Sequence, residues 1–233
     1  MNPTENISGK YKRLIADRRF VRALLGGVAL LIIALFINYY AAVYAFDRVS
    51  NSVTDIILSN VPVIDVDNIF IFGPIIFWAV IAAFCLYEPR RLPFTLKSIA
   101  LFVIVRSIFI TLTHLGPYPD HISLDINTML MSRWNLGNLL TFGSGGDLFF
   151  SGHTGLPFLF ALIFWKNYRM RIFCIIGAIF FGIVVLLGHL HYSIDVMAAF
   201  FITYSIYHIA EWLFKEDLGT FHKLHDPATN GKK

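Results

Sequence analysis

The chain has 233 residues, of which 57% are hydrophobic and only 15% are charged, and its mean hydropathy is +0.66. A soluble domain carries about 25% charged residues, so this composition excludes a disordered chain and argues against an ordinary soluble globule. The isoelectric point near 9.1 would suit a nucleic-acid partner, but none is expected, because the basic residues follow membrane topology. A multi-pass membrane protein is the class that remains.

Six apolar segments follow one another along the chain. A helix needs about 20 residues to cross roughly 30 Å of hydrocarbon, whereas these runs are too long and alternate too little for barrel strands. The predicted spans are Ala23–Phe46, Ile69–Tyr87, Ser98–His114, Leu148–Trp165, Ile172–Gly188 and Ser193–Phe214. The first is too long for a signal-peptide core and is expected to be retained. The predicted fold class is all-α integral membrane with six transmembrane helices.

Lysine and arginine residues gather on one side of this predicted bundle. Sixteen of the 19 lie in residues 1–22, the 88–97 loop, the 166–171 loop and the tail from 215. The positive-inside rule then places both termini in the cytoplasm. We divide the chain into a cytoplasmic basic segment over 1–22, a six-helix transmembrane domain over 23–214 and a cytoplasmic polar tail over 215–233, which is expected to be disordered.

The first of two polar clusters at the predicted outer face reads Gly145-Gly146-Asp147-Leu148-Phe149-Phe150-Ser151-Gly152-His153-Thr154. Free backbone N–H groups at the start of the fourth span favour an anion, phosphate above all. Gly152 permits close approach of the backbone, Ser151 adds a hydroxyl donor, and a charged His153 can donate a proton, with Asp147 as a supporting acid. An N-cap followed by a core histidine is the alternative, and it stays open.

The second cluster joins the fifth and sixth spans and reads Gly188-His189-Leu190-His191-Tyr192-Ser193-Ile194-Asp195. A spacing of four puts His191 and Asp195 on one helix face, so Asp195 could accept the Nδ1–H of His191 and leave Nε2 as a free lone pair. An oriented neutral imidazole suits a base or a nucleophile. An Asp195 that only caps the sixth helix is the alternative.

Topology brings both clusters to one membrane level, where polar groups are costly and usually mark function. Together they suit phosphoryl transfer through a phospho-histidine. His191 would attack phosphorus, His153 would protonate the leaving oxygen, and the Ser151–Thr154 amides would meet the developing charge. Arg106, inside the third span, would hold either the lipid phosphate or an acidic side chain.

These residues resemble signatures of the type 2 phosphatidic acid phosphatase (PAP2) superfamily. Ser151-Gly152-His153 is similar to its second signature, and His191 with Asp195 is similar to the end of its third. The strings Gly146–Thr154 and His189–Val196 resemble G-D-x-x-x-S-G-H-T and H-x-H-Y-[ST]-x-D-V of the sphingomyelin synthase and ceramide phosphoethanolamine synthase branch. Weaker likenesses are Pro62-Val63-Ile64-Asp65 and Arg106 with Leu115-Gly116-Pro117.

The resemblance implies a PAP2-like helical core and a lipid phospho-headgroup transferase that needs no metal or cofactor. Such an enzyme moves phosphocholine or phosphoethanolamine from phosphatidylcholine or phosphatidylethanolamine to ceramide or a similar lipid alcohol, and releases diacylglycerol. It makes His191 the nucleophile, Asp195 its partner and His153 the general acid. The supporting or substrate-binding candidates are Arg106, Asp147, Ser151, Gly152, Thr154, His189 and Tyr192.

Topology places this site on the non-cytoplasmic side, which is periplasmic in a bacterium and lumenal or extracellular in a eukaryote. Two departures from the superfamily pattern bear on the substrate. The K-x6-R-P element is missing, and Val184 and Val185 stand where an S-R dipeptide is expected. Fewer cations favour a singly charged phosphodiester over a monoester dianion. The donor headgroup, the acceptor and a homo-oligomeric state are left open.

Three alternatives use the same chain differently. A PAP2-type lipid phosphatase or a phospholipase-C-like hydrolase would use the same residues with water as acceptor. A transporter would show paired broken helices in two repeats, which the sequence lacks. Haem ligation by two of His114, His153, His189 and His191 would give Asp195 and the Ser-Gly-His-Thr string no purpose.

Overall fold

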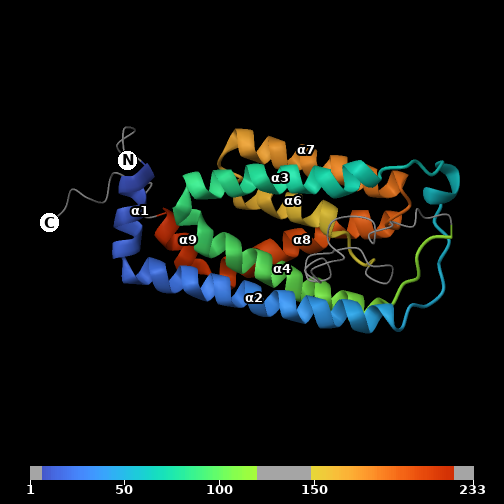
Figure 1. The fold of residues 1–233 in the computed structure, drawn as a ribbon, viewed down its shortest axis with the longest axis horizontal. Helices are drawn as coiled ribbons and strands as arrows, with labels where there is room; N and C mark the ends of the chain where they lie inside the picture. Colours follow the sequence, from blue (N-terminus) through green and yellow to red (C-terminus); the bar gives the residue numbers. More distant parts are fainter. Residues whose placement is uncertain (1–6, 120–147, 223–233) are drawn as a thin grey trace.

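The structure is a computed structural model that describes residues 7–119 and 148–222, and within these ranges every regular element is helical. Six helices run along the long axis of the molecule (Figure 1): α2 (Arg18–Phe46), α3 (Asp67–Tyr87), α4 (Leu92–Thr113), α6 (Gly152–Ile163), α7 (Tyr168–Leu187) and α8 (Ser193–Leu213). Two short helices, α1 (Ile7–Ala16) and α9 (Lys215–His222), lie at one end of this bundle. The 3-10 turn η1 (Leu58–Asn60), in the loop between α2 and α3, lies at the other end.

Five of the described helices are long and apolar enough to cross a membrane, namely α2, α3, α4, α7 and α8. This confirms a helical protein of multi-pass membrane type. The helix α6 is apolar but has only 12 residues, a rise of about 18 Å. Six full spans and the cytoplasmic position of the termini stay predictions.

The predicted fourth span, Leu148–Trp165, is longer than the helix found there. Residues 148–150 are not helical, because Ser151 occupies the N-cap and its side chain accepts from the Thr154 amide. Phe164 forms the C-cap, so the helix ends at Ile163, two residues before the predicted boundary at Trp165. The polar string that opens this segment therefore forms a cap, and only the apolar residues after it form a helix.

The predicted loops are too long at the basic end. The helix α2 begins at Arg18, five residues before the predicted start at Ala23, because Asp17 caps it by accepting from the Arg19 amide at 2.8 Å. The helix α4 begins at Leu92 instead of Ser98, with a proline in its first turn, a position that suits proline. Arginine and lysine are good helix formers, so they extend the apolar helices and the 88–97 loop shrinks to a tight turn.

The polar tail is not wholly disordered, since residues 215–222 form α9. Glu216 and Asp217 lie in its first turn, where acidic side chains interact favourably with the helix dipole. Asp217 also forms a salt bridge with Lys97 of α4 at 2.6 Å. This tertiary contact, which local sequence cannot report, fixes the start of the tail against the bundle.

The helices pack through aromatic side chains and close approaches at glycine. The helix α4 lies against both α2 and α8, while α6 packs on α7 and α8. One core cluster surrounds Phe102 and Phe150, and a second surrounds Phe77 of α3. A Cβ added at Gly177 of α7 would lie 2.6 Å from the Phe77 ring. This packing places the N-termini of α6 and α8 side by side at the end of the bundle that carries η1 (Figure 1).

Candidate active site

The first polar cluster lies at the N-terminus of α6. Ser151 is fully buried, and its Oγ accepts weakly from the Thr154 amide at 3.4 Å and from the Thr154 hydroxyl at 3.3 Å. The Ser151 amide is also engaged. Among the described residues, only the amides of Gly152 and His153 in this short string are left without an acceptor. The anion site predicted from the four Ser151–Thr154 amides is thus reduced to these two N–H groups.

The second cluster lies on the tight connection between α7 and α8. His191 and Asp195 are 4% and 0% exposed, and His191 Nδ1 lies 3.4 Å from Asp195 Oδ2. The contact is within ion-pair range, but it is not an aligned hydrogen bond. Oδ2 instead accepts from the Tyr192 amide at 3.0 Å. Asp195 therefore caps α8, and it also lies beside His191 without accepting a hydrogen bond from its Nδ1.

The helical spacing argument for this pair needs correcting. His191 precedes α8, which begins at Ser193, so the two residues do not share a helix face. They meet because the chain turns into α8 at Tyr192, and Asp195 reaches back to the turn from the first helical turn. The proximity of the two side chains follows from the helix cap and not from a helix repeat.

The two clusters touch each other. The Ser151 amide donates to the Asp195 carbonyl at 3.2 Å, which joins the N-cap of α6 to the first turn of α8. Gly182 of α7 makes the approach possible, since a Cβ there would lie 3.1 Å from Val196 and 3.3 Å from the Thr154 hydroxyl. The sequence predicted that both clusters share one level of the bundle, and the structure brings them into direct contact.

His153 enters the site from the first turn of α6. Its ring stacks on Phe70 of α3, with the ring centroids 4.2 Å apart and the planes inclined by 30°. Its Nδ1 is buried and has no hydrogen-bond partner among the described residues. His191 and Arg106 lie near it. Both histidines and one arginine thus gather at the junction of α4, α6 and α8.

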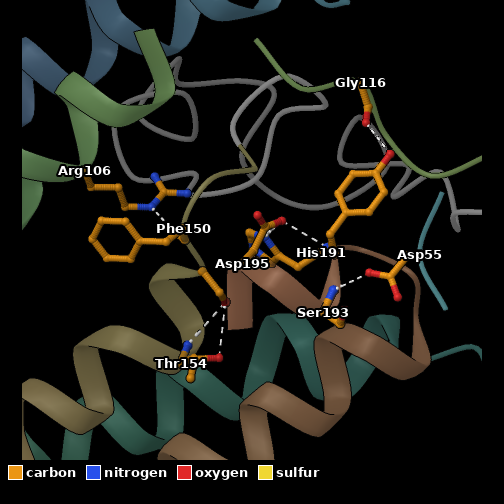
Figure 2. Close-up of polar contacts among 10 residues, drawn as sticks. Asp55, Arg106, Gly116, Phe150, Thr154, His191, Ser193 and Asp195 are labelled. Atoms are coloured by element: carbon orange, nitrogen blue, oxygen red, sulfur yellow. Dashed lines mark hydrogen bonds and ion pairs between the residues drawn. The ribbon is translucent and has the colours of Figure 1, made fainter. Parts of the chain in front are cut away.

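Arg106 is fully buried, and its Nε donates to the Phe150 carbonyl at 2.9 Å. Figure 2 shows the side chain reaching from α4 to the segment that leads into α6, beside His191 and Asp195. The sequence offered a lipid phosphate or an acidic side chain as its partner. Within the described residues its Nε bonds to a backbone carbonyl one residue before the N-cap, and this contact decides between neither alternative.

His189 and Tyr192 are held by the outer loops. His189 Nε2 lies 3.1 Å from the Val61 carbonyl, and its backbone takes the left-handed conformation with φ of 52°. The Tyr192 hydroxyl donates to the Gly116 carbonyl at 2.8 Å and accepts from the Val53 amide at 3.2 Å. Burial raises the pKa of this hydroxyl, so it remains a donor. These side chains stabilise the turn that carries His191.

Asp55 is a site residue that the sequence did not single out. It lies in the loop between α2 and α3, is 8% exposed, and its Oδ2 accepts from the Ser193 amide at 2.7 Å (Figure 2). Nothing in the local sequence marks this residue, because its partner lies more than a hundred residues away. Asp147, predicted as a supporting acid, lies outside the described residues.

A comparison with protein families finds the same region. The family model described as PAP2 superfamily C-terminal matches residues 144–212. This match supports PAP2 superfamily membership. The PAP2 match includes His153, His191 and Asp195, whereas Arg106 and Asp55 lie outside it. No curated protein and no solved structure matches the chain.

The PAP2 match suggests phosphatase or phosphotransferase-type chemistry on phosphate esters. This agrees with a site in which two histidines lie at a helix N-terminus. The match does not distinguish the sphingomyelin synthase branch from the rest of the superfamily.

Proposed function

We propose that the protein is a lipid phospho-headgroup transferase of the sphingomyelin synthase type, which moves phosphocholine or phosphoethanolamine from a glycerophospholipid to ceramide or a similar lipid alcohol. The contact between Ser151 and Asp195 carries the proposal, because it brings the His153 and His191 segments to one point. The PAP2 match supports the phosphate-ester chemistry, and the transfer itself is our inference from the cation count.

In the first half of the reaction, His191 Nε2 attacks the phosphorus of the donor lipid. The bond from phosphorus to the glyceryl oxygen breaks, and His153 gives its proton to that oxygen, so that diacylglycerol leaves. The headgroup phosphate stays on His191. Asp195, 3.4 Å from Nδ1, stabilises the charge that develops on the ring. The Gly152 and His153 amides donate hydrogen bonds to the phosphoryl oxygens, as donors preorganised at a helix N-terminus do.

In the second half, the primary hydroxyl of the acceptor lipid attacks the same phosphorus. His153, now neutral, takes the hydroxyl proton, and the bond from phosphorus to His191 breaks. Both histidines return to their starting states, so the two half-reactions balance without another reactant. Water in place of the lipid alcohol would make the protein a hydrolase.

Few cations lie near the site among the described residues, and this favours a diester substrate. The two positions where an S-R dipeptide would stand are Val184 and Val185, which are 4% and 0% exposed and lie within α7. Among the described residues near the site, Arg106 is the arginine that reaches it, and its Nε is bonded to a carbonyl. A phosphodiester carries a single negative charge and is better matched to this site than a dianion.

The test uses purified protein in detergent with headgroup-labelled phosphatidylcholine and phosphatidylethanolamine, each with and without ceramide. We expect label on ceramide with the parent protein and a loss of at least about 1,000-fold in His191→Ala. His208→Ala is the matched control, since His208 lies within α8, far along the helix from His191, is half-exposed and pairs with Glu211 at 2.9 Å. It should keep full activity.

The other results of this assay are equally clear. Release of water-soluble phospho-headgroup that does not depend on ceramide would make the protein a phospholipase-C-like hydrolase. Release of inorganic phosphate from phosphatidic acid would overturn the argument from missing cations and favour a lipid phosphatase. Full activity in His191→Ala on every substrate would refute the two-histidine mechanism.

A further inference from the structure

The loop between α2 and α3 covers the turn that carries His191, and Asp55 is its central residue. Oδ1 of Asp55 accepts from the Ile57 amide at 2.9 Å and the Leu58 amide at 3.1 Å, which closes the turn into η1. Oδ2 accepts from Ser193 at 2.7 Å. Each carboxylate oxygen therefore has its own role: one holds the loop in shape and the other holds α8.

Ser193 is the first residue of α8, so its amide is one of the N–H groups that a helix leaves without an internal partner. An N-cap side chain usually serves such groups. Here the N-cap residue is Tyr192, whose hydroxyl bonds elsewhere. Asp195 accepts a hydrogen bond from the Tyr192 amide. Asp55, from another part of the chain, accepts one from the Ser193 amide. The helix that holds Asp195 is thus capped from outside itself.

Further contacts fasten the same loop to both sides of His191. On the N-terminal side of His191, the Ile64 amide donates to the Leu187 carbonyl at 2.9 Å, and the Val61 carbonyl lies within hydrogen-bond distance of His189 Nε2. After it, the Val53 amide donates to Tyr192. Leu58 and Tyr192 also share a buried apolar cluster. The loop is therefore the support against which the 187–193 turn rests.

We propose that Asp55 is a positioning residue for His191, acting through the Ser193 amide to fix the start of α8 and with it the distance between His191 and Asp195. This inference rests on the proposed function. Ser193 lies two residues from His191 and two from Asp195 along the chain, so movement of its amide shifts both. A displacement of about 1 Å at a reacting group can cost on the order of 100-fold in rate.

The test removes this hydrogen bond from each side. Asp55→Asn presents only one acceptor oxygen, so it cannot serve both η1 and Ser193. Ser193→Pro removes the donor and leaves Asp55 in place. Proline is favoured at the first helical position, and Tyr192 has φ of −71° and ψ of 156°, the extended conformation that a residue before proline requires. Asp47→Asn is the matched control, because Asp47 is an exposed acidic residue at the start of the same loop.

We expect Asp55→Asn and Ser193→Pro each to lower kcat, per folded protein, by roughly 10- to 100-fold with KM nearly unchanged. The double variant should be no slower than the slower single variant, because both changes break one bond. Asp47→Asn should match the parent. Folded protein is counted by size-exclusion chromatography, and Ser193→Pro keeps the test valid should Asp55→Asn fold poorly.

Three results would overturn the positioning role: a rise in KM at constant kcat, losses that multiply in the double variant, or parental kcat in Ser193→Pro. The same preparation includes His191→Ala, which separates the two proposals. Loss of activity in His191→Ala with parental kcat in both loop variants refutes the role of Asp55 alone. Retained activity in His191→Ala refutes the proposed function and the positioning role together.

Discussion

The helices α6 to α8 and the loop between α2 and α3 contribute to the site in different ways. The first region supplies His153, His191 and Asp195, and it falls within the PAP2 match. The second supplies no histidine, and it lies outside the match, yet Asp55 and Val53 bond to the turn after His191. Reactive groups come from one region, and the geometry that holds them comes in part from another.

The difference shows that a short motif does not by itself fix where its side chains lie in the fold. Asp195 caps the turn that carries His191, but the next amide of α8 is satisfied only by Asp55. Arg106 likewise reaches from α4 to the residue before Ser151. The following predictions separate the chemical contribution of α6 to α8 from the positional contribution of the rest, beginning with the largest effect.

His153→Gln should lower kcat by roughly 100- to 10,000-fold, the usual contribution of general acid–base catalysis. The glutamine keeps polar atoms near the Phe70 ring but cannot exchange a proton at the leaving oxygen. The measurement is single-turnover transfer of labelled headgroup. A donor whose leaving group is more acidic should recover much of the rate, since it needs no acid. An unchanged rate with the natural donor would remove His153 from the mechanism.

Arg106→Met tests the region outside the match. The substitution leaves the buried Phe150 carbonyl without the donor that lies 2.9 Å away. An unsatisfied buried group costs about 1–3 kcal/mol, so the free energy of unfolding should fall by that amount and kcat should fall with it. Thermal unfolding in detergent measures the first effect. An equal loss of stability in Arg106→Lys would show that the shape of the guanidinium matters as much as its charge.

Gly177→Ala should destabilise the fold without touching the site. Its Cβ would meet the Phe77 ring at 2.6 Å, and overpacking of this kind costs about 1–3 kcal/mol. Gly26→Ala is the matched control, because its nearest neighbour is a lysine side-chain carbon at 4.0 Å. That variant should unfold at the parental temperature or above it. Equal midpoints for the two variants would contradict the close packing of α3 on α7.

The smallest expected effect is a pH dependence of the folding stability that arises from Asp55. Burial alone raises the pKa of this carboxyl, but the hydrogen bonds from Ser193, Leu58 and Ile57 outweigh it, and the pKa lies below its ordinary value of 3.8. The ionised group therefore stabilises the fold fully above 3.8 and loses this contribution as the pH falls through the lower folded pKa. Unfolding midpoints of the parent and Asp55→Asn should converge in acid. A difference between the two midpoints that grows in acid would contradict the lowered pKa of Asp55.

Much of this architecture could be predicted from composition and spacing. The apolar runs located α2, α3, α4, α7 and α8, since burial in a membrane depends on length and hydropathy alone. Errors arose at the ends. The helices that begin at Arg18, Leu92 and Tyr168 start before the predicted spans do, because a charged residue that stops a hydropathy count does not stop a helix.

The site shows the same division. The strings around His153 and His191 were visible in the sequence, as was the pairing of His191 with Asp195, although its helical rationale was wrong. Asp55 could not be found, because its partner Ser193 lies 138 positions away. A buried aspartate in a polar loop leaves no periodic signal. The nearest hint was its place between two apolar spans.

By itself, the sequence determined that the chain is a membrane-type helical protein and which short strings hold the candidate reactive groups, since both follow from local chemistry. Only the tertiary structure decided that Ser151 would bond to Asp195, that α6 would stop at 12 residues and that Asp55 would cap α8. The physical reason is that buried N–H and C=O groups must find partners wherever the packed helices place them. These partners are set by proximity in space and not by proximity along the chain.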